Sequence, residues 1–430
     1  VECFDALVDV AADGAAFFAK LAGDLARLVG AAANADAFEA TTRGRALEVA
    51  LALCEAAPAL ARRNAAVFVQ SLVPVAVGLS RAVEDDAAAA WAGRPCELAP
   101  LGERDDESDH AKAGDDALKR LCGALGKQVA PALLEFCGQA FGSASWVDAR
   151  CGLAALNALA LGAPKELKPH VATAAAVAAQ TIAAPASDPR CVVEACRLVG
   201  ALSMATKEAY QRACSENEIP SPVPALAAAL ADAARSPPRV AGALCAALSV
   251  FASAGEDDGG DPAYVDAHLD AVVPALASTL ARVGGDANAQ KATLDAVATV
   301  ASCAEGAFGP YYGTFMPTLL AALDATADRR HVDQIAAVRA RAIDCAAVVG
   351  SAVGVDAFAA DAPKVLAAIA GDLGAAGPQQ GGDDVDADLP LSVLLPAAVS
   401  VVKTCGGAAV DAYLEAIAAP LLAAATAVPQ

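Results

Sequence analysis

The sequence predicts an all-α protein, an α-solenoid (superhelix) of HEAT-type helix pairs. Its 430 residues exceed what one hydrophobic core usually holds, so we expect several domains or a repeat array. Hydrophobic residues make up 57% of the chain, alanine dominates them, and aromatic residues are only 4%. Alanine and leucine favour helix, whereas the β-branched and aromatic residues that favour strands are sparse.

A recurring proline predicts the repeat. Apolar helices with a proline near the start occur around Pro74, Pro131, Pro224, Pro274, Pro317, Pro363 and Pro420. From Pro224 onward these prolines are 43 to 57 residues apart, close to the period of roughly 40–47 residues of two-helix HEAT units. A helix pair cannot bury its own apolar stripe, so neighbouring pairs stack. We therefore expect residues 1–430 to form one continuous array, with the proline helices on its concave side.

The first elements along the chain are helices. "VECFDALVDVAA" already reads as a helix in progress, so we expect the sequence to begin inside a larger protein. Helices are predicted over 45–64 and around Pro74, and an acidic loop over 84–116 separates the next pair. Helical patterns then continue through 116–134 and 145–162.

The later elements are helices separated by acidic breaks. We interpret "EDDGGD" (256–261) as a solvated linker and residues 375–388 as an acidic, glycine-rich inter-helix linker. A helix is predicted over 309–325. Aromatic and leucine residues recur there at three- and four-residue spacing, so they form one stripe on the buried face: Phe308, Tyr312, Phe315, Leu319 and Leu323. Packing is favoured over ligand stacking for these aromatics, and Tyr311 lies beside the stripe, where it could reach solvent or a partner.

The loop over 84–116 is unusual in length and charge. It holds eleven acidic and three basic residues, and a long loop in a compact fold is usually functional or disordered. A solvated insertion without function is the other interpretation. Trp91 favours a function, because an isolated large aromatic in an acidic loop has no core to join.

Charge and cysteine content exclude some classes of function. The net charge of −21 argues against direct binding to nucleic acid, but it permits a basic protein partner or serves solubility alone. The thirteen cysteines are an odd number, and the closest pair, Cys191 and Cys196, lacks CxxC spacing, so a reducing compartment is expected. The longest uncharged run, 171–187, is mostly alanine and too weak a signal for a membrane span.

No catalytic or metal-binding pattern is evident. The histidines are scattered and lack metal-ligand spacing with one another or with cysteine: His110, His170, His268 and His331. No P-loop, no GxGxxG after a strand and no GxSxG motif occurs. We therefore expect a protein that is not an enzyme and that needs neither a cofactor nor a metal.

An ordered series of segments resembles the importin-beta (karyopherin-beta) nuclear transport receptors. The segments are "RALEVALALCEAAPALARRN" (45–64), "EDDAAAAWAG" (84–93), "DALKRLCGALGKQVAPALL" (116–134), "SWVDARCGLAALNALALG" (145–162), "TLDAVATVASCAEGAFGPYYGTFMPTLL" (293–320) and "RAIDCAAVVGSAVGVDAF" (341–358). They are most similar to the importin five (karyopherin beta three) branch, and they correspond to its middle section only.

The resemblance implies a monomeric import receptor segment that shuttles between cytoplasm and nucleus. Its expected partners are basic cargo of the ribosomal-protein or histone type, Ran-GTP, which releases the cargo, and Phe-Gly nucleoporins. Neither nucleic acid nor a membrane is expected as a partner. Carried over by position, the residues implied to contact cargo or Ran are Glu84, Asp85, Asp86, Trp91, Glu103, Asp105, Asp106, Glu107 and Asp109.

Two motifs depart from the family pattern. Ser145, Trp146 and Ala149 stand where the family has an Asp-Trp pair and an arginine, and Arg150 follows one place later. In the next repeat Asp188, Pro189 and Arg190 are kept, but Val192 replaces a second arginine. In the family these residues form ladders between repeats, so we expect local packing to differ here.

Two other functions remain open. One is a static HEAT-repeat scaffold, such as a phosphatase regulatory subunit or a coat adaptor, which needs neither an acidic loop nor nucleotide-switched release. The other is a solenoid domain attached to an enzyme outside the sequence.

Overall fold

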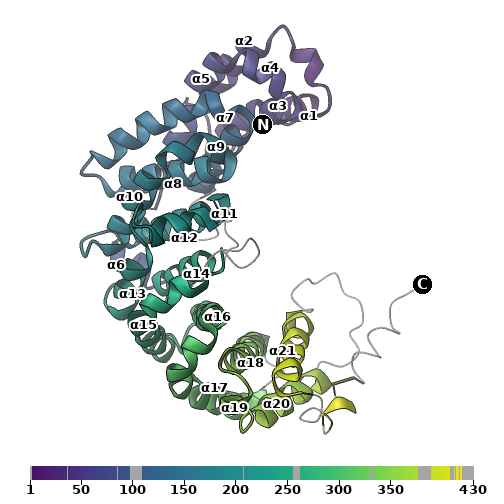
Figure 1. Cartoon of the computed structure of the whole chain (residues 1–430). Helices are drawn as coiled ribbons and strands as arrows, with labels where there is room; N and C mark the ends of the chain where they lie inside the picture. The colour runs from purple at the N-terminus through teal and green to yellow at the C-terminus, as the bar shows by residue number, and fades with distance from the viewer. Residues whose placement is uncertain are drawn as a thin grey trace. The chain divides into compact units, whose positions relative to one another are not determined.

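A computed structural model describes residues 2–35, 37–84, 86–96, 109–206, 208–254, 262–329, 333–375, 389–406, 411, 413–415 and 417–418 (Figure 1). Every regular element among these residues is a helix, and none is a strand, so the all-α prediction is confirmed. The chain forms two compact units. The first holds residues 1–92 and 99–222, and the second holds 93–98 and 223–430.

The first unit stacks helices in two layers. In chain order its elements are α1 (Glu2–Asp13), η1 (Ala15–Phe18), α2 (Ala22–Ala33), α3 (Ala40–Ala56), α4 (Pro58–Arg63), α5 (Ala65–Ser80), α6 (Ala88–Ala92), α7 (Asp109–Phe141), α8 (Trp146–Gly162), α9 (Pro164–Leu167), η2 (Lys168–His170), α10 (Val171–Ala183), α11 (Pro189–Thr206) and α12 (Glu208–Ser215). The α-helical dihedrals break at Gly126 (φ 11°, ψ −86°), which divides α7 into two arms. Helix α8 packs between α7 and α11.

The second unit repeats the same plan. Its elements are α13 (Val223–Ala231), α14 (Pro238–Ser253), η3 (Pro262–His268), α15 (Leu269–Arg282), α16 (Ala287–Ala304), η4 (Glu305–Tyr311), α17 (Tyr312–Thr326), η5 (Ala327–Arg329), α18 (Asp333–Val353), α19 (Val355–Phe358), α20 (Ala362–Ala375) and α21 (Leu389–Cys405). Helices α14, α16, α18 and α21 pack on one another in succession, and α13, α15, α17 and α20 form the second layer (Figure 1). These stacked pairs are the predicted solenoid architecture.

The prediction that the proline helices lie on the concave side is wrong for the second unit. Figure 1 shows α16, α18 and α21 on the inner side of this unit's curve, whereas the proline-bearing α13, α15 and α17 lie on its outer side. The inner helices carry buried small residues, among them Ala296, Cys303 and Ala346, which let successive helices approach closely. The more tightly packed layer occupies the inside of the curve.

The repeated prolines face solvent. Pro74, Pro274 and Pro317 lie inside α5, α15 and α17, and all three are exposed. Proline removes a backbone N–H and leaves a carbonyl oxygen without its helical donor. On the exposed side of a helix that oxygen can bind water, which explains why the repeat tolerates proline there. Pro420 and the acidic breaks at 256–261 and 376–388 lie outside the described residues.

The aromatic stripe in the second unit is packing. Phe308 and Phe315 are 0% and 1% exposed, and their rings stack with centroids 6.0 Å apart. The helix begins at Tyr312, not at residue 309, because the preceding turn is 3-10. Tyr312 donates to Asp361 at 2.9 Å and Tyr311 donates to Asp270 at 2.5 Å. The packing interpretation is therefore confirmed, and Tyr311 binds a neighbouring helix.

Candidate functional site

The structure describes only part of the predicted site. Glu84, Asp86 and Trp91 are described, and Asp109 is the first residue of α7. The remaining predicted site residues lie outside the described residues: Asp85, Glu103, Asp105, Asp106 and Glu107.

The predicted loop over 84–116 is wrong at two places. Residues 88–92 form the short helix α6, and residues 109–116 belong to α7. The run Ala87–Ala90 has high helix propensity, which favours α6. Ala111, Leu118 and Cys122 recur at helical spacing and are fully buried, which extends α7 toward its N-terminus. We call residues 84–92 the insertion start, because they are the described beginning of the acidic segment in the first unit.

Trp91 is part of a core. Its side chain is 4% exposed, and α6 packs against α11. The expectation that Trp91 has no core to join is therefore wrong. The reason is that α6 packs against α11, which lies far along the chain, and a reading of the local sequence alone does not show this contact.

Arg190 binds the backbone of the insertion start. Its guanidinium donates to the carbonyl oxygens of Glu84 and Asp86, each at 2.9 Å. It also contacts both carboxylate oxygens of Asp188, at 2.9 and 3.3 Å. The side chain is 6% exposed, so these contacts are largely shielded from water. Arg190 makes these four hydrogen bonds with its five N–H donors, one bond more than the three donors of a lysine could make.

Two tryptophan rings contact the same guanidinium. Its carbon atom lies 4.0 Å from the ring centroid of Trp146 and 5.7 Å from that of Trp91. Arginine attracts the negative face of an indole ring, and the attraction strengthens when water is excluded. We call this arrangement the Arg190 site: Arg190, Asp188, Trp91, Trp146 and the carbonyl groups of Glu84 and Asp86.

The local sequence at two helix starts explains the positions of Asp188, Arg190 and Trp146 in the Arg190 site. Asp188 precedes α11, Pro189 is its first residue, and the Arg190 N–H donates to the Asp188 carboxylate at 2.9 Å. This is the capping arrangement that acidic residues favour at a helix start. Trp146 is the first residue of α8, where Ser145 accepts a hydrogen bond from the Asp148 N–H. Two adjacent helix starts therefore set the arginine and one of its aromatic partners.

Arg190 contacts the insertion start through backbone carbonyl groups and not through its carboxylates. Arg190 binds carbonyl oxygens of Glu84 and Asp86 and takes its carboxylate partner from Asp188. The Glu84 side chain is exposed and that of Asp86 is partly exposed. Arg190 therefore holds these two residues without pairing with their carboxylates.

Arg150 forms the neighbouring ladder. It donates to Asp115 at 2.6 Å and to the carbonyl oxygen of Ser80 at 3.1 Å, and its side chain is 1% exposed. Arg150 thus joins α8 to α5 and α7, although it stands one place later than the family arginine. Val192, which replaces the second arginine, is buried in α11. Arg150 therefore contacts the core of the unit, whereas Arg190 contacts the insertion start.

The next described part of the insertion belongs to the second unit. The Cys96 N–H donates to Asp286 at 2.7 Å, and the Asn288 side chain donates to the Cys96 carbonyl at 2.8 Å. A Cβ on Gly242 would lie 2.4 Å from the Cys96 sulfur, so the close fit requires glycine there. Within that unit Cys96 is held against the start of α16.

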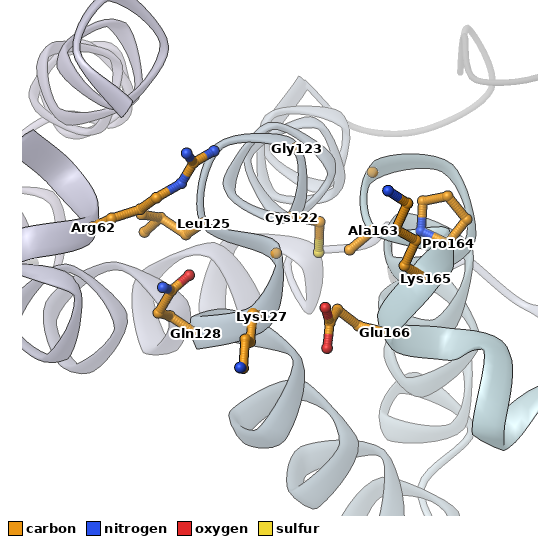
Figure 2. Close-up of a pocket in the computed structure, with 12 residues that line it drawn as sticks. Arg62, Cys122, Gly123, Leu125, Lys127, Gln128, Ala163, Pro164, Lys165 and Glu166 are labelled. Atoms are coloured by element: carbon orange, nitrogen blue, oxygen red, sulfur yellow. The ribbon is translucent and has the colours of Figure 1, made fainter. Parts of the chain in front are cut away.

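A separate cleft lies at the kink in α7. It has a volume of about 400 Å³, and its charged lining consists of Arg62, Lys127, Lys165 and Glu166 (Figure 2). The three cations are exposed and come from α4, α7 and α9. With Glu166 among them, the charged lining consists of three cations and one carboxylate.

The buried cysteines are poor nucleophiles. Burial raises the pKa of Cys54, Cys122, Cys137 and Cys245 to about 12. The thiolate is the reactive form, so these side chains act as small apolar residues at neutral pH. In the part of the chain that the structure describes, no group of three or more histidine, cysteine or acidic residues is placed to hold a metal ion. None of the described helices combines the length and apolar character needed to cross a bilayer.

Sequence reasoning found Trp91, Glu84 and Asp86 but missed the residues that hold them. Asp188, Arg190 and Trp146 stood out only as ladder residues. The available signal was the Asp-Pro-Arg start of α11 beside a second tryptophan in a chain that has only two. Their meeting with Trp91 depends on a fold-back across about a hundred residues of sequence, as in the Arg190 contact to Glu84 at a separation of 106.

Comparison with known proteins gives a family match to a segment that includes the insertion start. Residues 35–131 match the importin repeat family. The fold of 99% of the chain matches a crystal structure of Kap121p bound to Pho4p, with 21% identity and a TM-score of 0.82. Kap121p bound to Nup53p matches with 21% identity and a TM-score of 0.81, and Kap121p bound to RanGTP with 22% and 0.74, again over 99% of the chain. In each case the chain spans 38% of the length of the Kap121p chain.

These matches agree with the helix stacking described above. The importin repeat covers α3, α4, α5, the insertion start and the first arm of α7. Residues 35–131 therefore carry an importin repeat, and the chain has the helical solenoid fold of the Kap121p structures.

Proposed function

We propose that the chain is a segment of a nuclear transport receptor that binds basic protein cargo. The observation that carries this proposal is the overlap of the importin repeat at 35–131 with an acidic insertion whose first residues, Glu84 and Asp86, are bound by Arg190. Solved structures of the same fold include Kap121p bound to Pho4p, to Nup53p and to RanGTP. A fold that binds other proteins in this way requires no catalytic site.

Charge supports the class of cargo. The chain has 51 acidic and 30 basic residues, and the insertion adds acidic side chains beside the Arg190 site. Complementary charge accelerates encounter and selects partners, and its effect falls as salt rises. Lysine-rich proteins of the ribosomal-protein or histone type fit this surface, and Glu84, Asp86 and Trp91 belong to the contact segment that we propose.

The same proposal includes the partners and location of a receptor of the importin five branch. Ran-GTP releases the cargo, Phe-Gly nucleoporins bind during passage through the pore, and the protein works as a monomer that shuttles between cytoplasm and nucleus. The chain would correspond to the middle section of such a receptor and form one continuous repeat array.

The test is fluorescence-anisotropy binding of the chain to a labelled lysine-rich ribosomal-protein peptide over a salt series. A variant changes the acidic residues of the insertion to serine: Glu84, Asp85, Asp86, Glu103, Asp105, Asp106, Glu107 and Asp109. We expect salt-sensitive binding that weakens by at least about tenfold in the variant, equivalent to about 1.4 kcal/mol. An acidic peptide of equal length is the control. Failure of the lysine-rich peptide to bind at low salt would favour a static scaffold.

A further inference from the structure

We infer that Arg190 is the positioning residue of the insertion start: it holds Glu84, Asp86 and Trp91 so that the acidic side chains of Glu84 and Asp86 meet a basic partner in one arrangement. The identity of the partner, a basic protein, rests on the proposed function. The structural part of the inference rests only on the contacts of the Arg190 site.

The contacts specify a backbone conformation. Two hydrogen bonds of 2.9 Å hold carbonyl groups two residues apart, at Glu84 and Asp86. Five residues after Asp86, Trp91 lies over the same guanidinium, with its ring centroid 5.7 Å away. One side chain therefore holds both ends of the insertion start. A segment fixed at both ends loses less conformational entropy when it binds a partner.

Arg190 is itself held rigidly. Asp188 receives two of its donors, and Trp146 covers one face of the guanidinium at 4.0 Å. Cys191, the next residue, contacts the carbonyl oxygen of Trp146 at 3.3 Å. The rotamer of Arg190 is thus determined by α8 and α11, and the insertion start conforms to it.

The choice of carbonyl oxygens matters for binding. An arginine that paired with Glu84 or Asp86 carboxylates would order the segment but cancel its charge. Arg190 instead takes its counter-charge from Asp188, whose side chain is 11% exposed. Arg190 therefore orders the segment without itself pairing with the acidic side chains that a lysine-rich partner would meet.

The test compares two arginine-to-lysine variants. Arg190→Lys keeps the positive charge but has only three N–H donors for the four hydrogen bonds that Arg190 makes, and it lacks the planar fork that places them. Arg282→Lys is the matched control, because Arg282 also donates to two backbone carbonyls, those of Ser236 at 2.8 Å and Leu230 at 3.0 Å, in the second unit. Hydrogen exchange at residues 86–92 reports the order of the insertion start.

Trp91 provides a second readout. The chain has only two tryptophans, so Trp146→Phe leaves Trp91 as the sole fluorescent indole while keeping an aromatic face on Arg190. We expect Arg190→Lys to accelerate exchange at residues 86–92 by about tenfold or more, equivalent to about 1.4 kcal/mol of local opening. Acrylamide quenching of Trp91 should rise as well. Arg282→Lys should leave both unchanged.

Binding of the lysine-rich peptide completes the test. We expect Arg190→Lys to bind about tenfold more weakly than wild type at low salt, and Arg282→Lys to bind as wild type does. If wild type does not bind the peptide, the proposed function fails, and exchange and quenching still decide whether Arg190 orders the segment. Unchanged exchange and quenching in Arg190→Lys would overturn the inference. So would a loosened segment that binds the peptide as tightly as before.

Discussion

Arg150 and Arg190 lie near the starts of neighbouring helices in the same unit, yet they stabilise different things. Arg150 pairs with Asp115 in the core and joins α8 to α5 and α7. Arg190 pairs with Asp188, two residues away at the start of its own helix. Its other donors bind carbonyl oxygens of the insertion start. The first arginine therefore belongs to the stability of the unit, whereas the second belongs to the order of a surface segment. Residue type and burial alone do not separate these roles; the partners do.

The largest expected effect is loss of the core arginine. Arg150→Met leaves the Asp115 carboxylate buried without its counter-charge. Breaking a buried ion pair in this way costs about 3–5 kcal/mol in the free energy of unfolding. Chemical denaturation measures it, and we expect Arg190→Met to cost clearly less. The double variant Arg150→Met, Asp115→Leu should recover part of the loss, and an equal loss in the double variant would contradict the buried-charge explanation.

The second prediction concerns the close contact between α5 and α7, the two helices that Arg150 joins to α8. A Cβ at Gly114 would lie 2.3 Å from the Ser80 backbone nitrogen and 2.6 Å from the Ala76 oxygen. Gly114→Ala should therefore push α7 away from α5 and lower the free energy of unfolding by about 1–3 kcal/mol.

Gly78 in α5 is the matched control for that substitution. No atom lies within 4 Å of the position that its Cβ would take. Because glycine is a poor helix former, Gly78→Ala should raise the free energy of unfolding by about 0.5–1 kcal/mol. Destabilisation by both substitutions in the same denaturation experiment would contradict close approach as the cause.

A third arginine sharpens the comparison. Arg341 in α18 is partly exposed and pairs with Asp295 at 3.5 Å. Burial raises the pKa of Asp295 and of Asp344, and the Asp295 charge contributes to the rise at Asp344. Arg341 lowers the pKa of both carboxylates and Lys291 lowers that of Asp295, but they offset the effect of burial only in part.

The sign of the pH dependence follows from these raised values. The folded state binds protons more tightly than the unfolded state at these two groups, so their contribution to stability improves as pH falls from neutral through the raised folded-state pKa values. The gain is complete once pH is below the unfolded values near 4. Asp344→Asn should raise the midpoint of thermal unfolding at pH 7 and lose that advantage at pH 4. An advantage that persists at pH 4 would exclude the carboxylate charge as its cause.

The smallest expected effect is a difference in thiol reactivity. Cys151 and Cys191 directly follow the two arginines and are both buried, and burial raises the pKa of each, that of Cys191 to about 12. If the insertion start opens separately from the unit, Cys191 is exposed more often than Cys151. Pulsed alkylation read by mass spectrometry should show Cys191 reacting several-fold faster. Equal rates would mean that one global unfolding exposes both thiols.

Much of the fold was predictable from the sequence. Alanine and leucine content and the repeated proline predicted stacked helix pairs, and three- and four-residue spacing predicted the packing of Phe308 and Phe315. The layer that faces inward was not predictable from the prolines, because curvature depends on how closely the other helices approach. The start of α7 at Asp109 was hidden by the acidic residues around it.

The candidate site was predictable only in part. Charge and one tryptophan marked the insertion, since both are properties of a continuous segment. The Arg190 site joins residues 84–91, 146 and 188–190, which only the folded chain brings together. The sequence shows that Arg190 can donate hydrogen bonds, but it does not show that the acceptors are the backbone carbonyls of Glu84 and Asp86.

The most direct test of the account is a double-variant cycle on binding of the lysine-rich peptide at low salt. Wild type, Arg190→Lys, the pair Glu84→Ser with Asp86→Ser, and the combination are compared by fluorescence anisotropy. If Arg190 acts by positioning these acidic side chains, Arg190→Lys weakens binding in the wild-type background and changes it little once both acids are removed. Equal loss in the two backgrounds would show that Arg190 affects binding independently of the insertion, and the account would be wrong.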